Sequence, residues 1–330
     1  MKKLLYEEEY YADCRYALEE LHRYQGKNPC PKDHEAYWAR ALAELDAADP
    51  SVTLTASDFH APHILAYDLW FTGVGGARIH AKFLRPEKTE GKIPAVLHFH
   101  GYTGASSDWS YYLNYAYAGF AVLAMDARGQ GGLSEDVGGV KGTTYSGDIV
   151  RGLSDPNPDH LLFRNIFLDT AELAHIAMAM EFVDETRVCA FGGSQGGALT
   201  IACAALEPRV AKACFAYPFL CDYRHVWEMD LAKDAYAELA YFFRWFDPRH
   251  EKEELYFEKL GYIDLQYLAP RIRARVVMYT ALLDTTCPPS TQFAAYNHMV
   301  CEKRSVIYPD YRHERLPGME DEIFQFFCGE

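Results

Sequence analysis

From residue 93 onward, hydrophobic side chains gather in short, nearly continuous runs instead of alternating with polar ones. The runs that we expect to be strands are IPAVLHFHG, FAVLAMDARG, RVCAFGGS, AKACFAYP, ARVVMYTALLD and SVIYPDYRH. Strands that are buried on both faces have this composition. Segments with helical spacing separate them, such as 169–183, which carries an apolar stripe. This strand–helix alternation predicts an α/β fold with a doubly wound, mostly parallel sheet.

The pattern before residue 93 is different. Residues 4–46 are predicted to be helical, because Trp38, Ala41, Leu42 and Leu45 recur at helical spacing. Two β-rich runs, HILAYDLWF and ARIHAKFLRP, then flank TGVGG and predict a hairpin. We therefore expect an N-terminal helical extension over residues 1–50 and one α/β domain over residues 51–330.

Two later segments interrupt the strand–helix rhythm. Residues 133–165 are rich in Gly, Pro and Asp, which predicts a loop. Residues 222–262 are helical in pattern, aromatic and charged, and they lie between two expected strands. We interpret this second segment as an inserted helical cap.

Composition narrows the possible partners and the compartment. The 330 residues are 49% hydrophobic and carry a net charge of -15, which favours a large core and argues against a nucleic-acid partner. The first residues lack the apolar core of a signal peptide, and no 18-residue apolar run predicts a membrane span. Nine cysteines without paired spacing are typical of reduced thiols, so we expect a cytoplasmic protein.

One serine lies among four glycines directly after an apolar run, in CAFGGSQGGAL at residues 189–199. The stretch satisfies G-x-S-x-G around Ser194, with an expected strand before it and an expected helix after it. That context predicts a nucleophile elbow, a sharp turn that presents the serine hydroxyl at the edge of the sheet. We expect the glycines to let the turn close and to let the strand and the helix pack tightly around it.

A serine nucleophile needs a base and a third group that orients the base. In folds with this elbow the order along the chain is serine, then an acid, then histidine, each after a later strand. Asp284 and His313 follow two expected strands in that order. The competing residues, for which a surface, loop or packing role is the alternative, are Asp222, His225, His298 and Asp310.

The residues around the elbow also predict an oxyanion hole. The backbone N–H of Gln195 opens the helix after the serine, and that of Tyr102 lies in the loop after the third expected strand, HFHGYTG. His100 in the same loop could be mistaken for a catalytic base, but we interpret it as a brace for the loop. No metal or cofactor is expected.

Several motifs together resemble carbohydrate esterase family seven, the acetyl xylan esterases and cephalosporin-C deacetylases. They are FHGY (99–102), RGQGG (128–132), GGSQGG (192–197), PFLCDYR (218–224), CPPSTQFAAYN (287–297) and HE (313–314). The resemblance implies an α/β-hydrolase fold and the removal of acetyl groups from small acetylated sugars and from cephalosporin C. It also implies a homo-oligomer, a ring-like hexamer whose active sites face an inner cavity.

The resemblance assigns the same residues as the chain order. The triad falls on Ser194, Asp284 and His313, and the oxyanion donors fall on Tyr102 and Gln195. The motif residues beside the site are Arg128, Gln130 and Glu314. For Arg128 and Gln130 we expect a structural role, with the arginine bonding neighbouring carbonyls or carboxylates.

Other functions stay open at this point. A general carboxylesterase, a serine peptidase or an acetyl transferase could use the same fold, and a binding protein could keep the fold without catalysis. Aromatic residues of the expected cap could form a platform on which a sugar stacks, although aromatics at helical spacing more often pack internally. These residues are Tyr223, Trp227, Tyr241, Phe242 and Phe243.

Overall fold

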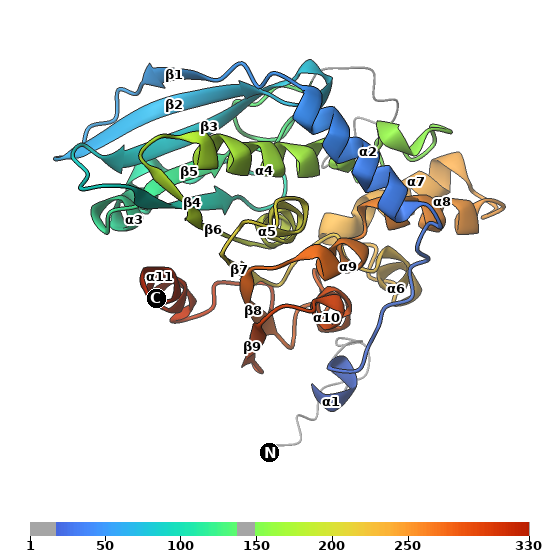
Figure 1. Cartoon of the computed structure of the whole chain (residues 1–330). Coiled ribbons are helices and arrows are strands. Elements are labelled where there is room, and N and C mark those ends of the chain that lie inside the picture. The colour runs from blue at the N-terminus through green and yellow to red at the C-terminus, as the bar shows by residue number, and fades with distance from the viewer. Residues whose placement is uncertain (1–17, 137–148, 330) are drawn as a thin grey trace.

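A computed structural model describes residues 18–136 and 149–329 of the chain (Figure 1). Nine strands form one sheet in the order β1-β2-β3-β5-β4-β6-β7-β8-β9. The strands are β1 (Thr53–Ala56), β2 (Ile64–Thr72), β3 (Arg78–Pro86), β4 (Ile93–Phe99), β5 (Ala121–Met125), β6 (Val183–Gly193), β7 (Lys212–Ala216), β8 (Arg275–Ala281) and β9 (Lys303–Tyr308). Strands β4 to β9 pair in parallel, while β1, β2 and β3 pair antiparallel at one edge. The predicted mostly parallel sheet and the β2–β3 hairpin are confirmed.

Helices cover both faces of this sheet, as Figure 1 shows. The α-helices are α1 (Leu18–Leu21), α2 (His34–Ala47), α3 (Leu113–Tyr117), α4 (Leu162–Ala179), α5 (Gln195–Leu206), α6 (Tyr223–Glu228), α7 (Ala237–Phe246), α8 (Glu253–Leu260), α9 (Leu265–Leu268), α10 (Pro289–His298) and α11 (Met319–Cys328). Residues of α2, α4 and α5 belong to the core on one face, and residues of α3 and α11 belong to the core on the other. Within the described residues, no helix is both long and apolar enough to cross a membrane.

The buried strands show why their sequence is continuously apolar. In β4, Leu97 and Phe99 face one core while Val96 faces the other, and β5 alternates in the same way. Since successive strand side chains point to opposite faces, a strand covered on both sides has apolar residues at successive positions, as Ala95, Val96 and Leu97 show. The parallel strands all end at the same edge of the sheet, where ligand sites of open α/β sheets form.

The N-terminal segment corrects the prediction of one helical stretch over residues 4–46. Residues 4–17 lie outside the described part of the chain, and among the rest only α1 and α2 are helical. Residues 22–33 are irregular because Pro29 and Pro31 cannot continue a helix and Gly26 has a φ of +78°. Trp38 is fully buried in the core that also covers the sheet. The boundary at residue 50 remains a prediction.

Two buried carboxylates fix this irregular segment to the start of α6. Asp222 accepts hydrogen bonds from the backbone N–H groups of Lys27 (3.0 Å) and Asn28 (2.8 Å) and from the hydroxyl of Tyr24 (2.7 Å). Asp264 in turn accepts a hydrogen bond from the backbone N–H of Asp222 at 3.1 Å. Burial raises the pKa of Asp264 to about 7, and the nearby Asp222 carboxylate adds to the rise.

This shift predicts a pH dependence of stability. The folded protein keeps a proton on Asp264 up to about pH 7, whereas the unfolded chain releases it near pH 4. Stability is therefore lost as pH rises between these values, by at most about 1.4 kcal/mol per pH unit. In Asp264→Asn this contribution should disappear, because an amide does not titrate in this range. The fold should be kept, because the Gln266 amide can turn so that its Oε1 accepts from the introduced side-chain amide. Urea unfolding from pH 4 to 8 measures the difference, and parallel curves for both proteins would contradict it.

The two interrupting segments are only partly as predicted. The expected loop over 133–165 ends early, because α4 already begins at Leu162, and residues 137–148 lie outside the described part. The segment 222–262 is mainly helical, as expected, and contains α6, α7 and α8. Its aromatic residues Tyr223, Phe242 and Phe243 are buried, with exposed fractions of 0–2%, so they pack internally.

Candidate active site

Ser194 lies between β6 and α5, in the sharp turn that the sequence predicts. Its backbone has φ 57° and ψ −120°, a combination that L-residues rarely adopt. Neighbouring segments hold this conformation, since the Ser194 N–H donates to the carbonyl of Ala216 at 3.0 Å, and the Ser194 carbonyl accepts from the N–H of Phe219 at 3.2 Å. The surrounding structure thus stabilises a strained residue and exposes its hydroxyl at the edge of the sheet.

Three of the four glycines are needed for close approach, and one is not. A Cβ on Gly196 would overlap the carbonyl oxygen of Phe99 at the end of β4, and one on Gly192 would lie 2.5 Å from the Gly196 carbonyl. A Cβ on Gly197 would lie 2.9 Å from the carbonyl oxygen of Ala216. For Gly193 the nearest atom is 3.4 Å away, an ordinary contact. The expectation that all four glycines are required is therefore wrong for Gly193.

This contrast predicts unequal effects of two alanine substitutions. Gly196→Ala should destabilise the protein by roughly 3 kcal/mol, because β4 and α5 must move apart. Gly193→Ala is the matched control and should change the free energy of unfolding by less than about 1 kcal/mol. Thermal unfolding of both variants measures this. Equal melting temperatures for the two variants would contradict the packing argument.

The structure brings the three predicted triad residues together. The Nε2 of His313 lies 3.1 Å from the Ser194 hydroxyl oxygen, and its Nδ1 lies 2.8 Å from Oδ2 of Asp284. The loops after β8 and β9 are joined by a hydrogen bond from the Leu283 N–H to the Tyr311 carbonyl at 2.9 Å. The Asp284 side chain is fully buried, whereas that of His313 is 26% exposed, so a ligand can reach the imidazole.

The loop after Asp284 orients the carboxylate and contributes a residue that sequence reasoning missed. The backbone N–H groups of Thr286 and Cys287 each donate to Oδ1 of Asp284 at 2.9 Å, which leaves Oδ2 for His313. The Cys287 thiol lies beside Ser194 and interacts with its side chain. Burial raises the pKa of this thiol well above its usual range, so it stays protonated and does not compete as a nucleophile.

The competing candidates lie elsewhere. The Nδ1 of His298 bonds the Ala294 carbonyl of its own helix at 2.7 Å, and Asp310 is exposed in a turn after β9. Asp222 is occupied by the N-terminal segment, and His225 lies in α6 beside the ring of Tyr24, with 5.1 Å between ring centroids. Among the available acids and histidines, the chain order therefore selected the pair that forms a hydrogen-bonded chain with Ser194.

His100 braces the loop after β4, as the sequence analysis proposed. Its Nδ1 lies 2.7 Å from the Gly101 carbonyl, and its Nε2 accepts from the backbone N–H of Ala127 at 2.9 Å. These partners define a neutral imidazole with its proton on Nδ1, and burial lowers its pKa accordingly. The side chain of Tyr102 in the same loop reaches the cap, where its hydroxyl donates to Glu238 at 3.2 Å.

Arg128 and Gln130 of the RGQ motif are hydrogen-bonded to other parts of the protein, and Arg128 bonds a carboxylate and a carbonyl. Arg128 donates two hydrogen bonds to Asp169, at 2.7 and 2.6 Å, and a third to the carbonyl of Val74 at 3.0 Å. The amides of Gln130 and Gln195 exchange two hydrogen bonds, both of 2.8 Å, which fixes the first residue of α5. The sequence alone offered no signal for Asp169.

Glu314 lies at the surface beside the candidate base. Its carboxylate accepts a hydrogen bond from the backbone N–H of Arg312 at 3.0 Å. This contact spans His313 and closes the turn that carries the imidazole. We find no contact of Glu314 with Ser194 or Asp284 among the hydrogen bonds of the described residues.

The fold and this geometry define an α/β-hydrolase with the serine–histidine–acid arrangement of acyl-transfer enzymes. The sequence model of the acetyl xylan esterase (AXE1) family matches residues 13–330. The chain belongs to the acetyl xylan esterase family and is a carboxylic ester hydrolase.

Two solved structures are similar over nearly the whole chain. Acetyl xylan esterase 1 from Thermoanaerobacterium sp. JW/SL YS485 is 56% identical, with a TM-score of 0.93 over 95% of this chain and 98% of that one. An acetyl xylan esterase from Paenibacillus sp. R4 is 34% identical, with a TM-score of 0.89 over 94% and 99%. Acetyl esterase Axe7A of Xylanibacter ruminicola is 27% identical over 291 residues, 86% of this chain, and the chain spans 63% of that relative's length.

Proposed function

We propose that this enzyme removes acetyl groups from acetylated xylo-oligosaccharides and from cephalosporin C, through an acetyl-enzyme on Ser194. The observation that carries the proposal is the continuous hydrogen-bonded chain Ser194–His313–Asp284, with distances of 3.1 and 2.8 Å. The similar proteins are acetyl xylan esterases and an acetyl esterase, which supports an acetyl ester as the class of substrate. The deacetylation of cephalosporin C rests on the resemblance of the sequence motifs.

The proposed reaction has two acyl-transfer steps. The Ser194 oxygen attacks the acetyl carbonyl carbon while Nε2 of His313 takes the hydroxyl proton, and Asp284 holds the imidazole with its other proton on Nδ1. The tetrahedral intermediate collapses, and the sugar alcohol leaves with the proton from His313. A water molecule then attacks the acetyl-serine with the same proton transfers, which releases acetate and restores Ser194.

The backbone N–H groups of Tyr102 and Gln195 are the proposed oxyanion donors. Gln195 is the first residue of α5, where N–H groups lack partners within the helix and the helix dipole is positive. The loop of Tyr102 begins where β4 packs directly against the elbow, at the contact between Phe99 and Gly196. A donor of this kind contributes about 2.7–4 kcal/mol to stabilising the transition state.

A substrate panel with the purified chain tests this function. We expect acetate release from acetylated xylobiose and from cephalosporin C, and rates that fall from acetyl to butyryl to octanoyl p-nitrophenyl esters. Ser194→Ala is the control for background hydrolysis. Equal rates for all three acyl lengths would indicate a general carboxylesterase, cleavage of a peptide amide alone would indicate a peptidase, and acetylation of an added alcohol would indicate a transferase.

We also propose that the enzyme assembles as a homo-oligomer, with the hexamer as the state that the motif resemblance implies. The edge strand β1 supports an interface, because all four of its residues are exposed and Leu54 has an exposed fraction of 48%. An exposed edge strand offers backbone groups to another chain. Light scattering after size-exclusion chromatography tests the proposal, and a monomer at micromolar concentration would refute it.

A further inference from the structure

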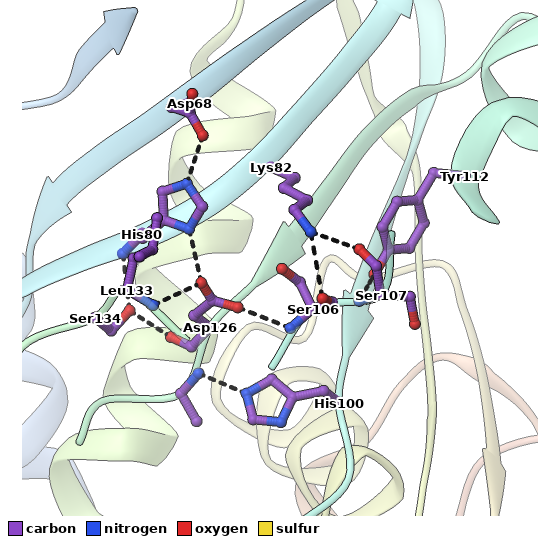
Figure 2. Close-up of polar contacts among 11 residues, drawn as sticks. Asp68, His80, Lys82, His100, Ser106, Ser107, Tyr112, Asp126, Leu133 and Ser134 are labelled. Atoms are coloured by element: carbon purple, nitrogen blue, oxygen red, sulfur yellow. Dashed lines mark hydrogen bonds and ion pairs between the residues drawn. The ribbon is translucent and has the colours of Figure 1, made fainter. Parts of the chain in front are cut away.

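A buried histidine outside the triad lies between two carboxylates. His80 of β3 is 1% exposed, its Nδ1 lies 2.7 Å from Asp126, and its Nε2 lies 2.8 Å from Asp68 of β2 (Figure 2). A neutral imidazole can donate a hydrogen bond from only one nitrogen, so two carboxylate partners define an imidazolium. Burial alone would lower the pKa of His80, but the hydrogen bonds to Asp126 and Asp68 outweigh it and raise the pKa.

Asp126, the residue after β5, connects this imidazolium to two loops. Its carboxylate accepts hydrogen bonds from the backbone N–H groups of Ser106 at 2.7 Å and Leu133 at 3.0 Å. The Ser134 hydroxyl donates to the Asp126 carbonyl at 2.6 Å and accepts from the backbone N–H of His80 at 2.8 Å. Figure 2 shows His80, Asp126 and these loop residues as one connected network.

The two loops are those beside the catalytic serine. Residues 100–107 carry Tyr102, and residues 127–134 carry Gln130, whose amide is paired with that of Gln195. The loops are also tied to each other by a hydrogen bond from the Gly131 N–H to the Gly104 carbonyl at 3.0 Å. Lys82 of β3 adds a second anchor, since its Nζ donates to the carbonyls of Ser107 (2.6 Å) and Ser106 (3.3 Å).

We propose that the His80 imidazolium is a positioning residue for the esterase reaction, because it fixes through Asp126 the loops that carry Tyr102 and Gln130. The inference rests on the oxyanion role of Tyr102 and Gln195 in the proposed function. His80 is hydrogen-bonded to Asp126 and Asp68 and not to Ser194. It therefore acts on the position of the oxyanion donors and not on the serine itself. A misplacement of about 1 Å at a reacting centre can cost roughly 100-fold in rate.

The groups that face His80 determine how it responds to pH. Asp68 approaches from β2 and Asp126 from the end of β5, while the ring of Trp70 lies with its centroid 5.0 Å from that of the imidazole. Along β3 itself, Lys82 is directed at the Ser106 and Ser107 carbonyls, and the backbone N–H of Arg78 donates to Glu135 at 3.0 Å.

Loss of the His80 proton leaves one of its two carboxylate partners without a hydrogen-bond donor, so kcat should fall on the alkaline side.

Two substitutions test the inference. His80→Gln should lower kcat for p-nitrophenyl acetate roughly 10-fold or more with little change in KM, and its alkaline decline should disappear. Asp68→Asn removes only the 33%-exposed carboxylate, so kcat near pH 7 should stay within about 3-fold of wild type. Its alkaline decline should move to lower pH, because the imidazolium has lost one of its two anionic partners.

A matched control and the opposing outcomes make the test decisive. His175 of α4 is also paired with a carboxylate, since its Nε2 lies 2.9 Å from Glu207. His175→Gln removes this pair and should leave both kcat and the pH profile unchanged. A folded His80→Gln with wild-type kcat would overturn the inference, as would an alkaline decline of Asp68→Asn that coincides with wild type. The Asp68→Asn comparison tests the inference even if His80→Gln fails to fold. Absence of acetate release by the wild-type chain would instead refute the proposed function itself.

Discussion

Ser194→Ala is expected to lower kcat for acetyl esters by at least about 10⁴-fold. The hydroxyl is placed to attack an ester while its proton moves to His313, 3.1 Å away. Alanine has the same backbone strain at φ 57° and removes no packing atom of the sheet, so the variant should fold like wild type. Initial rates with p-nitrophenyl acetate, together with thermal unfolding, measure both expectations.

A fluorophosphonate probe provides an independent readout of the same residue. Wild type should be labelled with a stoichiometry of about one per chain, and Ser194→Ala should not be labelled. Ser57→Ala is a matched control, because the Ser57 hydroxyl accepts a hydrogen bond from the Phe59 N–H in the segment before β2 and should be dispensable. Labelling of the Ser194→Ala variant, or turnover close to wild type, would show that another residue is the nucleophile.

The central features of the fold were predictable because they depend on local sequence. The short apolar runs identified β4 to β9, and β4 to β8 are strands whose side chains pack into the cores on both faces of the sheet. The elbow was predictable because its glycines lie within a few residues of Ser194. Asp284 and His313 could be selected because parallel strands place their ends at one edge of the sheet, so chain order translates into spatial order.

Long-range partners were not predictable in the same way. Asp169 meets Arg128 across 41 positions of the chain, and Asp126 meets His80 across 46. The sequence around each carboxylate does not identify its partner, because the pairs form only when α4 packs against the sheet and β3 pairs with β5. The Cys287 thiol beside Ser194 belongs to the same group.

The errors in the prediction share a physical origin. Helical periodicity in residues 34–47 was extended too far toward the N-terminus, although the prolines at 29 and 31 exclude a helix there. Gly193 was grouped with its neighbours because composition does not show how close another backbone comes. In both cases the pattern was real, and its limits were set by single residues or by tertiary contacts.

Asp284→Asn is expected to lower kcat at neutral pH by about 10⁴-fold while the fold is kept. The amide oxygen can still accept from Thr286 and Cys287, so the nitrogen will face Nδ1 of His313. This N–H donor stabilises the tautomer whose proton is on Nε2, and such an imidazole cannot take the proton of Ser194. The rate constant with p-nitrophenyl acetate and the rate of fluorophosphonate labelling should therefore fall together.

Asp310→Asn is the matched control for this prediction, because Asp310 lies three residues from His313 but is exposed in the preceding turn. If Asp284 alone orients the imidazole, Asp310→Asn keeps wild-type kcat and labelling. An inactive Asp310→Asn together with an active Asp284→Asn would transfer the orienting role to the loop of the histidine itself. The hydrogen bond of 2.8 Å between Asp284 and His313 favours the first result, since a carboxylate buried to 1% exposure keeps its partner in one orientation.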